Sequence, residues 1–124
     1  MNTRINSEKA PSAIGPYSQA IRAGDRLYLS GQLGVEASTG NMPEAFAEQA
    51  GLVMKNIGFI LEEAGFAFTH IVKTTIFLDD LENFSAINEI YGAYFPDYKP
   101  ARSCFEVSRL PKGAKVEIEV IAER

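Results

Sequence analysis

Cysteine and histidine are nearly absent from this chain, which has one of each, Cys104 and His70. A single cysteine excludes a disulfide within the chain and is typical of proteins from the reducing cytoplasm. Zinc sites usually combine several Cys and His ligands, so no zinc site is predicted. We therefore expect a cytoplasmic protein without a disulfide or a bound metal.

Long apolar runs and long basic runs are missing as well. No stretch of about 18 apolar residues occurs, and residues 1–16 lack the apolar core of a signal peptide, so neither a membrane span nor secretion is predicted. The net charge is −4 and the pI about 5.0. Tight binding to nucleic acid needs clustered Lys and Arg to neutralise phosphates, so this balance gives a nucleic-acid partner little support.

The chain does contain enough apolar material for one core, with eight Phe and five Tyr. Its length of 124 residues fits one domain, which we expect to span residues 1–124. Two extended runs over 18–23 and 27–33 flank a Gly-Asp pair and predict a β-hairpin. Alternation in the second run should put its three leucines on one face, and Ser30 and Gln32 on the other.

Hydrophobic periodicity predicts two helices among several strands. Gly65 follows the first helix, where a left-handed residue is favoured, and Asp79 and Asp80 can cap the second. Because helices and strands both carry apolar stripes, we expect an α+β protein with both helices on one sheet face. The other face stays exposed unless further subunits cover it. The predicted elements are strands over 18–23, 27–33, 71–78, 102–108 and 115–122, helices over 44–64 and 81–94, and a further short strand over 4–6.

The last two strands are predicted to pair as a hairpin, with the turn centred between Leu110 and Pro111. The same register satisfies both hydrophobicity and charge, and a one-residue slip would mix apolar with polar groups. It brings Arg102, Cys104 and Glu117 together on the sheet face away from the helices. The cross-strand pairs on that face are Arg102 with Glu119, Cys104 with Glu117, and Glu106 with Lys115.

This group of side chains could bind an anion and activate water. A guanidinium is a planar fork that binds a carboxylate through two hydrogen bonds, and a nearby carboxylate can accept a proton from water. The alternative is that Arg102 only pairs with Glu119 across a wet sheet face. Cys104 is more often a small buried residue than a nucleophile, and His70, at a strand start, is expected to be a satisfied structural residue or a surface residue rather than its base.

Three further candidates stay open on the residues alone. Tyr17 could be a core aromatic or a pocket wall. The segment around Ser30 and Gly31 interrupts an apolar strand, which favours a bulge or close packing at the glycine. Asn88 could simply lie on the polar side of the second helix.

Five segments taken together resemble the RidA (YjgF-like) family of reactive-intermediate deaminases, and the similarity covers nearly the whole chain. The specific part is the Pro-Ala-Arg block followed by Val-Glu-Ile-Glu. The resembling segments are Gly15–Ala20, Leu29–Gln32, Asn88 with Tyr91, Pro100–Cys104 and Val116–Glu119.

The resemblance implies a chorismate-mutase-like, two-layer α+β fold with a mixed sheet and two helices on one face. It also implies a homotrimer with the sheets as an inner barrel, the helices outside, and a cleft between each pair of subunits. The implied enzyme is a 2-iminobutanoate/2-iminopropanoate deaminase, a hydrolase acting on C–N bonds. It converts 2-imino or enamino acids, including 2-aminoacrylate, to 2-keto acids and ammonia without a cofactor.

The resemblance also implies what individual residues do. Arg102 would grip the substrate carboxylate, assisted by the backbone N–H of Cys104, and Glu117 would position or activate the hydrolytic water. Two other functions remain open, an endoribonuclease that inhibits translation and a non-catalytic trimer that senses keto acids or acts like a chaperone. The implied pocket residues, some from a neighbouring subunit, are Tyr17, Ser30, Gly31 and Asn88.

Overall fold

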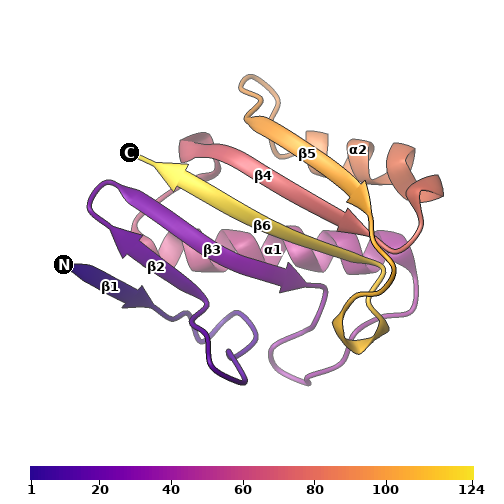
Figure 1. Ribbon diagram of the computed structural model, residues 1–124, viewed down its shortest axis with the longest axis horizontal. Coiled ribbons are helices and arrows are strands. Elements are labelled where there is room, and N and C mark those ends of the chain that lie inside the picture. Colours follow the sequence, from indigo (N-terminus) through magenta and orange to yellow (C-terminus); the bar gives the residue numbers. More distant parts are fainter.

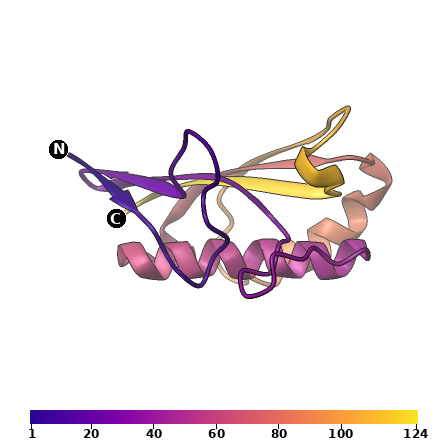
Figure 2. The same ribbon diagram turned by 90° about the horizontal axis from the view of Figure 1, so that it is seen from below.

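The computed structural model describes residues 1–124 and contains a six-stranded mixed sheet with two α-helices on one of its faces. Seen edge-on, both helices lie on the same side of the sheet (Figure 2). The expected two-layer α+β architecture is therefore confirmed. The strands are β1 (Asn2–Ile5), β2 (Ala20–Ala23), β3 (Arg26–Leu33), β4 (Ile71–Leu78), β5 (Ala101–Glu106) and β6 (Val116–Glu123), and the helices are α1 (Phe46–Ala64) and α2 (Phe84–Gly92).

Helix α1 covers the middle of the sheet because its buried residues recur at steps of three and four. It ends where predicted, at Gly65, whose φ of 78° is the left-handed conformation that glycine adopts without a steric penalty. Neither helix combines the length and the apolarity that crossing a membrane requires. The buried apolar residues of α1 are Ala50, Val53, Met54, Ile57, Ile60, Leu61 and Ala64.

The predicted hairpin between the last two strands does not form, and this prediction was wrong. The sheet order is β1-β2-β3-β6-β4-β5, so β4 lies between β5 and β6 (Figure 1). β4 pairs with β5 in parallel and with β6 antiparallel. The physical reason is helix α2, since a strand–helix–strand segment lays its two strands side by side in parallel, with the helix packed on one face.

The true register also reverses the expected face of β5. Arg102 is aligned with Thr74 of β4, and Cys104 with Ile76, both of which are buried beneath the helices. Because residues paired across strands point to the same face, Arg102 and Cys104 lie on the helix side. Glu117 lies on the open side, as predicted.

The ion pairs derived from the hairpin register are absent too. Glu106 accepts a hydrogen bond from the backbone N–H of Leu81, at 2.8 Å. Lys115 donates to the carbonyl of Glu44 at 2.7 Å and lies 3.7 Å from its carboxylate. Lys115 is the only one of the four residues in the predicted pairs that forms an ion pair, so charge complementarity did not determine the register of β5.

Strand β3 carries a bulge in which Ser30 and Gly31 lie opposite a single residue of β6, Glu119. The extra residue shifts the alternation by one. Gln32 consequently turns to the buried face and Leu33 to the open face, opposite to the predicted pattern. The expected irregularity at Gly31 is confirmed.

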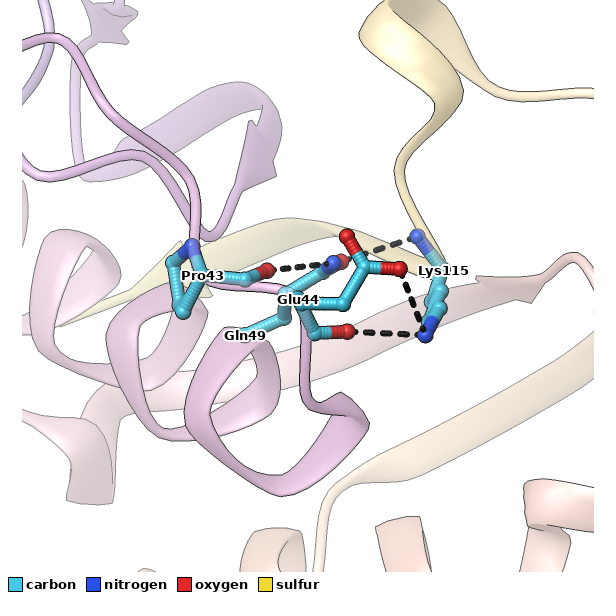
Figure 3. A network of polar contacts seen from close by, with 4 residues as sticks. All are labelled: Pro43, Glu44, Gln49 and Lys115. Atoms are coloured by element: carbon cyan, nitrogen blue, oxygen red, sulfur yellow. Dashed lines mark hydrogen bonds and ion pairs between the residues drawn. The ribbon is translucent and has the colours of Figure 1, made fainter.

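Buried amide side chains hold the loops at one end of the sheet. In helix α1, Gln49 donates to the carbonyl of Pro43 at 2.8 Å and accepts from the backbone N–H of Lys115 at 2.9 Å (Figure 3). Lys115 in turn contacts Glu44, which is drawn in the same figure. Asn56, from the same helix, donates to the carbonyl of Leu33 at the end of β3, at 3.1 Å, and to that of Val35 in the following loop, at 2.9 Å. The loop between β3 and α1 is therefore fixed against the core.

A third buried amide, Gln19, fixes the N-terminal loop. It accepts from the N–H of Ser7 at 2.7 Å and donates to the carbonyls of Ser7 and Pro11 at 3.1 and 2.9 Å. Each of these bonds replaces water that the buried groups would otherwise need. Both loops are thus held at the rim of the open sheet face.

Candidate active site

A cavity of about 820 Å³ lies where the two fixed loops meet the open face of the sheet. It has 17 lining residues, both apolar and charged. Four of the residues singled out in the sequence, Tyr17, Ser30, Gly31 and Glu117, line this cavity together.

Glu117 is one of two carboxylates of strand β6 that line this cavity, the other being Glu119. The cross-strand neighbours of Glu117 are Leu33 on one side and Phe77 on the other, and neither offers it a hydrogen bond. Burial raises the pKa of the Glu117 carboxyl, and the negative charge of Glu119 on the same face raises it further. A carboxylate with a raised pKa in a cavity is suited to accept a proton from water.

The absence of a side chain at Gly31 leaves the space that the Glu117 carboxylate occupies. A Cβ atom at position 31 would overlap Oε2 of Glu117 and lie 2.8 Å from its Cδ. The bulge therefore brings bare backbone against the carboxylate, which is the close packing expected from the glycine.

Ser30 is hydrogen-bonded to the chain segment that directly follows Tyr17. The Ser30 hydroxyl donates to the carbonyl of Ser18 at 2.6 Å, and its N–H donates to the carbonyl of Gln19 at 2.9 Å. Tyr17 precedes this tethered segment and is 52% exposed, so its ring is a cavity wall and not a core residue.

Arg102 lies in the edge strand β5, on the face of the sheet that carries the helices, and contacts helix α2. Its Nη1 donates to Oδ1 of Asn88 at 2.7 Å. The guanidinium carbon lies 5.5 Å from the ring centre of Phe84 and 5.3 Å from that of Tyr91. A guanidinium has five N–H donors, and this chain engages one of them, so a fork remains free for an anion.

Cys104 shares that side of the sheet with Arg102 and packs at the border of the core. Burial raises the pKa of its thiol, which the positive charge of Arg102 lowers only in part. A thiol with a raised pKa is a poor nucleophile at neutral pH. Its strand β5 is the sheet edge, where one row of backbone N–H and C=O groups has no strand partner.

The predicted cluster of Arg102, Cys104 and Glu117 is therefore not formed within one chain. Arg102 and Asn88 lie on the helix side at the β5 edge, whereas Glu117 lies on the open side, with β4 between β5 and β6. Arg102 is also not paired with Glu119, which was the alternative. The candidate residues form two separate halves.

His70 belongs to neither half. It lies in the short 3₁₀ turn Phe68–His70, where its Nδ1 accepts from the N–H of Ala67 at 2.9 Å and its ring meets Phe66 edge-on. The expectation of a satisfied structural histidine is confirmed. No group of three or more His, Cys, Asp or Glu side chains is close enough to hold a metal ion.

Sequence reasoning missed several residues that line the cavity, among them Glu36 and Lys112. Glu36 lies between the predicted strand over 27–33 and the predicted helix over 44–64, and Lys112 lies in the turn predicted next to Leu110. Their contribution depends on how those loops fold back over the sheet, and periodicity carries no signal for this.

A family model described as Endoribonuclease L-PSP matches residues 7–124. The chain belongs to this family, the RidA (YjgF-like) proteins. This RidA chain is 48% identical over 119 residues to the "2-iminobutanoate/2-iminopropanoate deaminase" of Rattus norvegicus, covering 95% of this chain and 87% of the relative. The family resemblance found in the sequence is thereby confirmed.

Solved structures of relatives share the fold of this RidA chain. A Rid-family protein from Yersinia pestis, YyfA, is 49% identical over the full length of both chains, with a TM-score of 0.98. TdcF of E. coli, crystallised with bound serine, is 42% identical over 98% of each chain, with a TM-score of 0.95. The structural similarity confirms the expected fold class.

Proposed function

We propose that this chain hydrolyses 2-imino acids, such as 2-iminopropanoate and 2-iminobutanoate, to 2-keto acids and ammonia. The observation that carries the proposal is the Glu117 carboxyl, whose pKa is raised by burial and which faces the cavity of about 820 Å³ without a hydrogen-bond partner. Relatives that are 48% identical over 95% of this chain carry the name of that activity, and TdcF was crystallised with an amino acid.

The complete site is proposed to form between subunits of a homotrimer. Two observations support this arrangement. The Arg102 half and the Glu117 half lie on opposite sides of the sheet, so a second copy must bring them together. The sheet face without helices also exposes aromatic side chains, Tyr28 at 42% and Phe105 at 54%, which contact with another subunit would cover.

The chemistry then follows from the two halves. An enamine substrate first tautomerises to the imine. The guanidinium of Arg102 holds the substrate carboxylate by its free donors, with Asn88 keeping the fork in place. Glu117 accepts a proton from water as the water oxygen bonds to the imine carbon, and the proton passes to the nitrogen. The hydroxyl proton of the tetrahedral adduct then moves through Glu117 to the amino group, so that the C–N bond breaks, ammonia leaves and the keto group forms.

In this mechanism the protein contributes two things to imine hydrolysis, the positioning of the reactants and the transfer of protons. Holding the imine and the water together supplies a large part of the rate, and a general base adds about a hundred- to ten-thousandfold. The cytoplasmic location expected from the single cysteine is part of the same proposal.

An endoribonuclease is the second candidate, because the matching family model carries that description. The cavity offers it little: three of its four charged lining residues are acidic, Glu36, Glu117 and Glu119, and His70 lies outside it. RNA cleavage by the purified chain that disappears in Glu117→Gln would favour this candidate. Cleavage unchanged by that substitution would indicate a contaminant.

Mixed trimers test the deaminase and the shared site together. Arg102→Ala and Glu117→Gln chains are each expected to be inactive towards imines that an amino-acid oxidase generates. Chains mixed in equal amounts and allowed to exchange should regain about a quarter of wild-type activity, because about one site in four then joins an intact Arg102 to an intact Glu117.

The controls separate the possible outcomes. Wild-type chains mixed with tagged wild-type chains measure losses from the exchange itself. If the two inactive variants never complement although exchange is complete, both halves of the site act within one chain and the shared site is wrong. If wild type hydrolyses no imine but binds 2-keto acids, the chain is a keto-acid sensor.

Gly31→Ala should reduce kcat for imine hydrolysis by about ten- to a hundredfold, because the new methyl group displaces the Glu117 carboxylate by a distance on the order of 1 Å. The overlap is with the free end of a side chain, so the melting temperature should stay within about 5 °C of wild type. Gly51→Ala is the matched control, since a methyl group there meets open space. Full kcat in Gly31→Ala would show that the position of this carboxylate is not critical.

A further inference from the structure

Lys112 has an unusual backbone conformation for a residue with a side chain. It lies in the turn Pro111–Gly113 with φ 60° and ψ 18°, and no other non-glycine residue of the chain has a positive φ. Left-handed backbone is unfavourable for a residue with a Cβ atom, and glycine would adopt it without this penalty. A strained residue that persists is often found where its side chain has a function.

Lys112 is one of the residues that line the cavity containing Glu117. It is the one cation among the lining residues, beside the carboxylates of Glu36, Glu117 and Glu119. It takes part in none of the three ion pairs of the chain. Its ammonium group is therefore not committed to holding the fold together.

These charges matter because a 2-imino acid carries a carboxylate. Three acidic side chains repel such an anion from the cavity, and a cation at its rim lowers this barrier and attracts the substrate. Within one chain, Arg102 lies on the helix side of the sheet and not at this cavity, so it cannot attract the substrate carboxylate into the cavity of its own chain.

We propose that Lys112 is a positioning residue that draws the substrate carboxylate into the Glu117 cavity, and that the strained backbone places its ammonium group there. This inference rests on the proposed imine hydrolysis. It assigns Lys112 to substrate entry, whereas Arg102 holds the docked substrate and Glu117 acts on water.

Three substitutions separate the charge from the backbone. Lys112→Gly removes both charge and strain, Lys112→Asn removes the charge but tolerates the left-handed backbone, and Lys112→Arg keeps the charge. We expect the neutral variants to raise KM by about three- to tenfold, with a smaller fall in kcat, and to weaken the dependence of kcat/KM on ionic strength. Lys112→Arg should stay near wild type.

Thermal melting distinguishes a role in substrate binding from a purely structural role of Lys112. Lys112→Gly should melt no lower than wild type while binding substrate more weakly. An active enzyme in which Lys112→Gly keeps the wild-type KM and salt dependence, or in which Lys112→Arg is as impaired as Lys112→Gly, overturns the role of Lys112 alone. A wild-type chain that hydrolyses no imine overturns this inference together with the proposed function.

Discussion

Arg102→Ala is expected to lower kcat/KM for 2-iminopropanoate by about a hundred- to ten-thousandfold, because two charge-assisted hydrogen bonds to the substrate carboxylate are worth roughly 1.5–3 kcal/mol each. The guanidinium is already oriented by Asn88 and by the rings of Phe84 and Tyr91, so little ordering remains to be done when substrate binds. Steady-state kinetics on oxidase-generated imine measure the loss.

Two matched variants show that the fork is what matters. Arg102→Lys keeps the charge but not the planar pair of donors, so it should recover only part of the activity. Asn88→Ala keeps the guanidinium but frees it, and should cost about tenfold through lost orientation. Should Arg102→Ala retain kcat/KM within about threefold of wild type, another cation holds the carboxylate and the proposed mechanism fails.

The elements of the fold were predictable because they follow from local periodicity. The strand over 71–78 and the first helix, ended by Gly65, were placed within two residues of their positions in the structure. Their apolar spacing and the glycine that ends the helix are properties of a few consecutive residues. Nothing from distant parts of the chain was needed.

Strand pairing was not predictable in the same way, because it depends on which segments meet. The sequence from Ile71 to Glu106 reads strand–helix–strand, which favours parallel neighbours, while the turn after Leu110 favours a hairpin. With β4 between β5 and β6, the parallel pairing forms and the hairpin does not. Edge position also suits β5, whose Arg102 and Glu106 are polar. Two plausible charge pairs misled because Arg102, Glu106 and Lys115 each contact another group.

The family resemblance named candidate residues, and the structure shows how they are arranged within one chain. Tyr17, Ser30, Gly31 and Glu117 do share a cavity, whereas Arg102 and Asn88 share a different edge of the same chain. Contacts between subunits leave no periodic signal in a single sequence. The bulge at Gly31, by contrast, could be suspected because a glycine interrupts an apolar strand.

Glu117→Gln is expected to lower kcat by about a hundred- to ten-thousandfold, the range typical for loss of a general base, while the protein becomes more stable. The side chain keeps its shape, so KM should change little. In wild type, kcat should fall with acid at a pH above the ordinary titration range of a glutamate, because burial and Glu119 raise the pKa of Glu117. Glu117→Gln should lose that limb of the pH profile.

The gain in stability has a definite dependence on pH. The pKa of Glu117 is raised in the folded chain, so the folded state holds the proton more tightly than the unfolded state, and stability falls as pH rises from the unfolded pKa through the folded one. Above that window the ionised carboxyl destabilises the fold by a constant amount, which glutamine removes. Melting temperatures of the variant and wild type should therefore differ most at neutral pH and converge in acid. A variant that melts below wild type at neutral pH would mean that the buried carboxylate stabilises the fold, and that its raised pKa is not the origin of its reactivity.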